Sequence, residues 1–214
     1  MSVFKERIYS LLEQAELKPE ATEEQLTTDH SIIKAADCKT IYNALGGQKD
    51  WKEIEPFLSD ITVSGTHIFV DGYKDFNRYR SETIKSDLYD SFSAFDLSSY
   101  KRFCRNFEKE CIKSGANRKD WTSKTAEYHF GDASDPGDFY KNGSPLWKLN
   151  AFRNLLSDHY YSAGKKFVRI SIYDNLMING SLNRLDKLLL TSNPVSEPPI
   201  IKYLSRRLGL IKQL

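Results

Sequence analysis

The sequence has few of the features that mark a secreted, zinc-binding or membrane-spanning protein. It contains three cysteines, an odd number, and no C-x-x-C pair, so neither a disulfide framework nor a zinc site is indicated. No apolar run approaches the roughly 18 residues of a membrane span, and the charged, amphipathic start MSVFKERIYSLLEQ lacks the pattern of a signal peptide. We therefore expect a cytoplasmic protein that does not associate with membranes.

A strong charge imbalance is also missing. Lys+Arg 31 against Asp+Glu 29 leaves a net charge of +2, which neither requires nor excludes nucleic acid, because a local basic face matters more than the total. The hydrophobic share of 40% and the aromatic share of 13% are enough for a core. A chain of 214 residues fits one domain, since domains run to about 100–200 residues.

The segment 60–80, DITVSGTHIFVDGYKDFNRYR, carries the clearest local pattern. Apolar alternation before Ser64-Gly65 and the apolar run after it predict an antiparallel hairpin of strands 61–64 and 66–71. The run from Phe167 to Ile172 predicts a third strand, buried in the same sheet, because its apolar residues leave little surface for water.

Apolar residues at helical spacing predict helices around these strands. We expect helices over 2–17, in one or two pieces between 22 and 45, over 76–89, from Ser98 or Ser99 to Gly115, and over 146–164, 182–189 and 200–208. Cys104 and Cys111 share one face of the helix that ends at Gly115, and we expect both to be core thiols rather than a redox pair. The predicted class is α/β, with a small mixed sheet flanked by helices.

Residues 115–145 lack apolar periodicity and concentrate Gly, Pro, Asp and Ser, which predicts a long loop. Asp132, Asp135 and Asp138 could be metal ligands in this loop. Their spacing matches no calcium loop, because the closing glutamate is absent, so solvated turn acids are the favoured interpretation.

The hairpin would bring two carboxylates, Asp60 and Asp71, near one another, with Lys74 just beyond. Paired carboxylates with a nearby cation are the parts that hold a divalent metal ion and hydrolyse a phosphodiester. The sequence therefore offers a candidate metal-dependent site at Asp60, Asp71 and Lys74.

The order of several short motifs resembles very-short-patch-repair endonucleases and related nucleases of the restriction-endonuclease-like PD-(D/E)XK superfamily. Asp60 matches the acid that opens the hairpin, and Asp71-Gly72 matches the polar residue and glycine that end the next strand. Trp147-Lys148 and Arg153 match residues of the following helix, which leads to the strand K-F-V-R-I-S.

This resemblance implies a restriction-endonuclease-like fold with additional terminal helices. The whole chain, 1–214, would form one domain. Its parts would be a helical layer over 1–58, a nuclease-like core over 59–175 with an insertion at 81–145, and C-terminal helices over 176–214.

It also implies a Mg²⁺-dependent endonuclease, a hydrolase that cuts the phosphodiester bonds of DNA. Asp60 and Asp71 would bind Mg²⁺, and Lys74 would neutralise developing charge or orient the water. Nucleic acid, with DNA favoured, would be held through its phosphates by four basic side chains: Arg78, Arg80, Lys148 and Arg169.

A second interpretation stays open. Phe69 stands where related nucleases carry their second carboxylate, and Asp75 stands where they often carry a histidine. Both differences favour a catalytically degenerate member of the fold, acting as a nucleic-acid or protein binding module.

Overall fold

The structure, a computed structural model, describes residues 2–21, 35–91, 94–191 and 193–210. The chain divides into two compact units, each assembled from separate stretches of sequence. Unit 1 comprises Met1–Glu24, Ser59–Gly72 and Lys165–Leu214, and unit 2 comprises Gln25–Leu58 and Tyr73–Gly164. The prediction of a single domain with three consecutive parts is not tested by this division and stays a prediction.

Unit 1 contains a four-stranded sheet in the order β1-β2-β3-β4. β1 and β2 pair antiparallel, as do β2 and β3, whereas β3 and β4 run parallel. The predicted mixed sheet is therefore confirmed, with strands β1 (Glu20–Ala21), β2 (Ile61–Val63), β3 (Thr66–Asp71) and β4 (Lys166–Ser171).

The predicted hairpin is confirmed, and its turn follows from two residues. Val63 faces Thr66 across the strands, so only Ser64 and Gly65 connect them. Both have positive φ, at 47° and 74°. A two-residue turn with positive φ at both positions matches the right-handed twist of the flanking strands.

The two faces of this sheet differ in polarity because side chains alternate along each strand. One face carries the buried aliphatic residues Ile68, Val70, Val168 and Ile170. The burial of Val168 and Ile170, at 8% and 0% exposure, confirms the buried third strand. Phe69, Asp71 and Arg169 belong to the other face, where the Arg169 guanidinium lies 4.6 Å from the centroid of the Phe69 ring.

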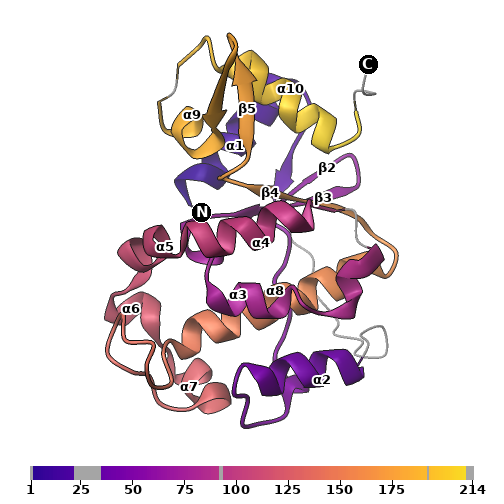
Figure 1. The fold of residues 1–214 in the computed structure, drawn as a ribbon. Coiled ribbons are helices and arrows are strands. Elements are labelled where there is room, and N and C mark those ends of the chain that lie inside the picture. The colour runs from indigo at the N-terminus through magenta and orange to yellow at the C-terminus, as the bar shows by residue number, and fades with distance from the viewer. Residues whose placement is uncertain (1, 22–34, 92–93, 192, 211–214) are drawn as a thin grey trace. The chain divides into compact units, whose positions relative to one another are not determined.

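The remaining elements of unit 1 lie on one side of the sheet (Figure 1). The helices over 2–17 and 200–208 are confirmed as α1 (Val3–Gln14) and α10 (Glu197–Arg207). The helix over 182–189 was placed wrongly at its start, because Leu182 belongs to an unpredicted hairpin. That hairpin and the helix after it are β5 (Asn175–Ile178), β6 (Ser181–Arg184) and α9 (Leu185–Thr191).

Unit 2 is helical in its described residues. Its α-helices are α2 (Ala35–Ala44), α3 (Arg78–Thr83), α4 (Leu97–Asn106), α5 (Glu108–Gly115), α6 (Arg118–Trp121), α7 (Lys124–Phe130) and α8 (Pro145–Ser162). Short 3₁₀ turns occur at Trp51–Glu53, Tyr73–Asp75 and Asp87–Ser91. The predicted helical stretch between 22 and 34 lies outside the described residues.

Three sequence predictions for unit 2 need correction. The helix over 76–89 is shorter: α3 is bounded by 3₁₀ turns. The helix that ends at Gly115 is two helices, α4 and α5, because the helix is interrupted at Phe107. The N-cap of α4 is Asp96 rather than Ser98 or Ser99. The long loop over 115–145 is interrupted by α6 and α7, which leaves an irregular stretch after Phe130.

The longest helix of unit 2, α8, begins where the sequence supplies a start signal. The Ser144 hydroxyl accepts a hydrogen bond from the backbone N–H of Trp147, and Pro145 occupies the first turn. A serine cap followed by proline is favourable because it satisfies one free N–H and removes another. The Trp147 side chain packs against Cys111 and Trp121, and the three cysteines are buried free thiols, as predicted for Cys104 and Cys111.

Candidate anion-binding pocket

The two predicted metal ligands both belong to unit 1, and each is already engaged by a cation. Asp60 accepts hydrogen bonds from the Lys5 ammonium at 2.5 Å and from the backbone N–H of Val70 at 2.8 Å. Burial raises the pKa of Asp60, although the Lys5 charge and both hydrogen bonds act in the opposite direction; the Asp71 charge raises it further. The carboxylates of Asp60 and Asp71 are therefore close enough to repel one another.

Asp71 forms an ion pair inside the sheet. The Arg169 Nη1 lies 2.7 Å from the Asp71 Oδ1, and the two side chains are 0% and 5% exposed. Arg169 is opposite Phe69 in the sheet, and Asp71 lies two residues further along β3. Residues two apart share a face, so the side chains of Asp71 and Arg169 reach one another diagonally. This contact makes Arg169 a partner of Asp71 within the sheet.

The proposed third member, Lys74, belongs to unit 2. Its ammonium lies 2.7 Å from Asp120 Oδ1, and this contact lowers the pKa of Asp120. Among the described residues, no group of three or more His, Cys, Asp or Glu side chains could hold a metal ion. Because Asp60 and Asp71 are already neutralised by lysine and arginine, the residues present do not fit Mg²⁺.

The acids of the irregular stretch make turn contacts. The Asp138 N–H donates to the Asp135 carbonyl, and its side chain accepts from the N–H of Tyr140. These contacts match the favoured interpretation of solvated turn acids.

Arg80, one of the four predicted phosphate contacts, is also held inside the protein. Arg80 is 2% exposed, and its Nη2 donates to Asp158 Oδ2 at 2.8 Å. The Tyr89 hydroxyl donates to the same carboxylate oxygen at 2.6 Å. Arg80 and Arg169 are therefore both committed to buried carboxylates, whereas Arg78 and Lys148 line one pocket.

This pocket, hereafter the Lys148 pocket, has a volume of about 360 Å³ and lies wholly within unit 2. Its walls are the C-terminal end of α2, helix α3, the segment 139–142 and the first turn of α8. The lining residues are Ala44, Leu45, Gly46, Arg78, Tyr79, Glu82, Phe139, Lys141, Asn142 and Lys148. Sequence reasoning named two of them and missed Tyr79, Lys141 and Asn142.

Lys148 is the distinctive side chain of this pocket. It is 7% exposed, and its ammonium donates to the neutral Asn142 Oδ1 at 2.6 Å. It also lies 5.7 Å from the centroid of the Tyr79 ring. Within the described residues, Lys148 has no carboxylate in ion-pair contact, and burial lowers its pKa with no opposing charge contribution. A buried ammonium without a carboxylate is costly unless an anion compensates for it.

Gly46 and Asn142 both lie beside that ammonium. Gly46 has φ of +83°, and a Cβ there would lie 3.5 Å from the Lys148 Nζ. Asn142 is held by donating to the carbonyls of Phe130 and Asp132, both at 2.8 Å, so its acceptor oxygen points at Lys148 from a fixed position. The pocket is therefore built around Lys148.

Arg78 borders the same pocket from α3. Its guanidinium makes a two-point contact with Glu108, through Nε at 2.8 Å and Nη2 at 3.0 Å, and lies 3.9 Å from the centroid of the Phe139 ring. Its side chain remains 47% exposed. The Nη1 N–H groups, which do not contact Glu108, can therefore still donate to an anion, although Glu108 offsets the charge.

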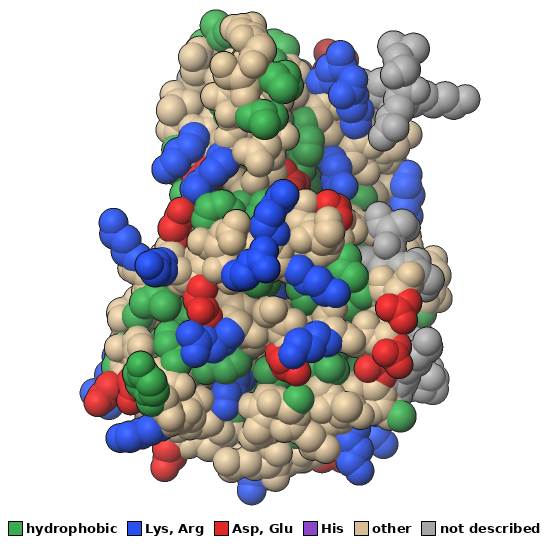
Figure 2. All heavy atoms as spheres, in the orientation of Figure 1, with side chains coloured by type: hydrophobic (Ala, Val, Ile, Leu, Met, Phe, Trp, Pro, Cys, Tyr) green, Lys and Arg blue, Asp and Glu red, His purple; other side chains and the backbone are tan. Residues whose placement is uncertain are grey.

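On the face drawn in Figure 2, Lys and Arg side chains are interspersed with Asp and Glu side chains. Long-range attraction of a polyanion to this face is weak under such a mixed field, so anion binding there depends on local sites.

The fold and pocket together define a mixed α/β protein with a small sheet and a helical unit that holds a pocket around the buried Lys148. The chain belongs to a family of unknown function, DUF7255, whose model matches residues 40–191. The comparisons found no matching curated protein and no matching solved structure. The likeness to PD-(D/E)XK nucleases stays a prediction.

No helix among the described residues is both long enough and apolar enough to cross a lipid bilayer.

Proposed function

We propose that this protein binds single-stranded nucleic acid without cutting it, through the Lys148 pocket. The observation that carries the proposal is the Lys148 ammonium, buried beside a neutral amide with no carboxylate in ion-pair contact. A phosphate entering the pocket would supply the missing negative charge. Lys141 lies in the same lining and adds a further cation, and Arg78, although paired with Glu108, can add N–H donors from Nη1.

An exposed aromatic residue beside the pocket favours a nucleic acid over a small anion. Tyr140 is fully exposed, with a relative accessibility of 102%, and its neighbours Phe139 and Lys141 line the pocket. Proteins that bind single strands combine cations for the backbone with aromatic rings for unstacked bases. A base could stack on Tyr140 while the adjacent phosphate occupies the pocket.

The contacts of the predicted catalytic residues favour binding without cleavage. Asp60 and Asp71 are paired with Lys5 and Arg169, and Lys74 is paired with Asp120. A metal ion would have to displace these cations before it could activate a water. The proposal is thus the binding-module interpretation of the sequence, with DNA as the preferred first ligand.

The first test measures binding and its salt dependence. We expect a fluorescein-labelled oligothymidylate of about 15 nucleotides to bind wild-type protein, with affinity falling between about 50 and 200 mM salt as phosphate contacts predict. Lys141→Ala should weaken binding and reduce the salt slope by about 1. Lys101→Ala, an exposed lysine of α4, is the matched control and should change neither.

The same protein incubated with Mg²⁺ or Mn²⁺ should leave labelled DNA and RNA strands at full length. Cleavage that vanishes in Asp60→Ala would overturn the proposal in favour of the metal-dependent nuclease. Absence of any binding to DNA or RNA at low salt would count equally against it.

The second test concerns stacking. Tyr140→Ala should weaken oligothymidylate binding by about tenfold, because base stacking on an aromatic ring contributes about 1–3 kcal/mol. Tyr140→Phe retains the ring and should bind almost as wild type. Tyr128, which is half-exposed on α7 and does not line the pocket, provides the matched Tyr→Ala control. Equal losses in Tyr140→Ala and Tyr140→Phe would show that the ring is not a stacking platform.

A further inference from the structure

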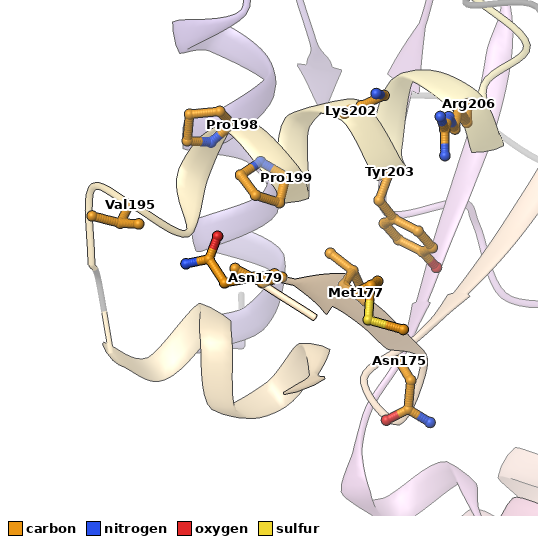
Figure 3. Close-up of a pocket in the computed structure, with 11 residues that line it drawn as sticks. Asn175, Met177, Asn179, Val195, Pro198, Pro199, Lys202, Tyr203 and Arg206 are labelled. Atoms are coloured by element: carbon orange, nitrogen blue, oxygen red, sulfur yellow. The ribbon is translucent and has the colours of Figure 1, made fainter. Parts of the chain in front are cut away.

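Unit 1 contains a groove between β5 and α10 that the proposed function does not use. Its volume is about 590 Å³, and its lining comes from β5, the following Asn179, Val195 and one side of α10 (Figure 3). Apolar side chains supply part of the wall, among them Met177, Val195 and the pair Pro198-Pro199. Met177 and Val195 are 62% and 64% exposed, so the groove presents apolar surface to solvent.

The strand that forms one wall has a free edge. β5 pairs antiparallel with β6, and the two form a separate two-stranded sheet. Among the described residues, no other strand pairs with β5. The N–H and C=O groups on its far edge are therefore positioned to pair with an added extended chain.

The opposite wall is basic. Lys202 and Arg206 lie one helical turn apart on α10, are exposed, and form no ion pair with any described residue. No acidic residue lines the groove. Two acids directly precede lining residues in the sequence. Asp174 accepts a hydrogen bond from the Tyr203 hydroxyl, and Glu197 forms an ion pair with Arg7.

We infer that this groove binds an extended acidic peptide, which adds to β5 as a further strand and pairs its carboxylates with Lys202 and Arg206. The free strand edge supplies backbone hydrogen bonds, and alternate peptide side chains would face the apolar wall near Met177 and the two basic residues. The exposed apolar wall favours a peptide over a nucleic-acid backbone, which would find cations here but no matching apolar contact. This inference is independent of the Lys148 pocket.

Methionine provides a specific probe of the groove. The chain has two methionines, Met1 and Met177. In protein labelled with ¹³C at the methionine methyl groups, the Met177 resonance can be assigned with Met177→Leu. An acetylated peptide of alternating glutamate and valine, about eight residues long so that it extends beyond both ends of the four-residue β5, should shift this resonance and slow hydrogen exchange of the β5 amides.

Charge reversal tests the basic wall. The double variant Lys202→Glu/Arg206→Glu should bind the glutamate–valine peptide at least about tenfold more weakly, a change of about 1.4 kcal/mol. Lys101→Glu/Lys124→Glu, which alters the net charge equally at exposed positions of unit 2, should lose less than about twofold. Because the methyl spectrum also shows whether the double variant is folded, a loss of binding can be distinguished from unfolding.

Four results would overturn the inference. The first is no Met177 shift at millimolar peptide, and the second is an equal shift with a lysine–valine peptide of the same length. The third is a Met177 shift without added protection of the β5 amides, which would exclude strand addition. An oligothymidylate that shifts Met177 more strongly than the acidic peptide would identify the groove as a nucleic-acid site and also count against it.

Discussion

Asp71→Asn is expected to lower the free energy of unfolding by about 3 kcal/mol, as measured by urea denaturation. The substitution retains the shape of the side chain and removes the negative charge that faces Arg169 at 2.7 Å, with both side chains almost completely buried. The Arg169 guanidinium would then lose the charge of Asp71 while remaining buried. Breaking a buried pair from one side is costly because the remaining charge stays desolvated.

The matched control is Asp120→Asn. Its partner Lys74 is 47% exposed, and Asp120 itself is 30% exposed, so solvent screens the pair and the expected loss is below about 1 kcal/mol. Oligothymidylate affinity should be unchanged in folded Asp71→Asn. If the variant is instead as stable as wild type and abolishes a metal-dependent cleavage, Asp71 is a catalytic ligand and the nuclease interpretation holds.

Lys148→Met should weaken oligothymidylate binding without lowering the stability of the protein. The substitution replaces a buried ammonium with an apolar chain of similar length, so oligothymidylate affinity should fall at least about tenfold. The free energy of unfolding should stay equal or rise by about 1 kcal/mol, because an uncompensated buried charge is removed. Loss of function with retained or increased stability distinguishes a ligand-binding lysine from a structural one.

The matched control for Lys148→Met is an exposed lysine. Lys101→Met, on exposed surface, should change neither quantity. Burial lowers the pKa of Lys148, so the unfolded chain retains the proton to higher pH than the folded protein does. Wild-type stability should therefore rise relative to Lys148→Met as pH rises through the lowered pKa toward about 10.4. A stability loss above about 2 kcal/mol in Lys148→Met would show that the lysine is structural.

Local turn chemistry and apolar pattern predicted the sheet of unit 1 well. Ser64-Gly65 specified the hairpin because both residues adopt positive φ, and the apolar run after Phe167 predicted a buried strand, although β4 lies at the edge of the sheet. The same turn logic could have found β5 and β6, since Asn179-Gly180 also has positive φ at both positions. Leu182 was instead counted with the leucines of α9, because helical spacing continues by chance across the strand end.

The helical unit was less predictable. A single periodic pattern covered α4 and α5, since the break at Phe107 keeps apolar residues at compatible spacing. Short helices such as α6 bury one or two residues and leave no periodic signal to detect. Tertiary contacts, rather than local propensity, fix these pieces.

The candidate sites depended on pairings that sequence order does not show. Arg80 and Arg78 lie two residues apart, yet one reaches the buried Asp158 and the other remains at a pocket edge. Lys148 was named from a family likeness, and only the structure shows that its ammonium faces Asn142 without a carboxylate. The Tyr140-Lys141 dipeptide beside it is visible in the sequence, and the proposed function gives it a role because single-strand binding combines a cation with an aromatic ring.

The connection between β3 and β4 has a consequence for the nascent chain. Val70 pairs with Ile170, and the entire segment Tyr73–Gly164 lies between them in sequence. During translation every residue of unit 2 is therefore made before the first residue of β4. Until β4 is made, one edge of β3 has no strand to pair with, and an unpaired strand edge can pair with other chains. Early folding of unit 2 would shorten the flexible chain that must close before β4 can pair, which lowers the entropic barrier to that step.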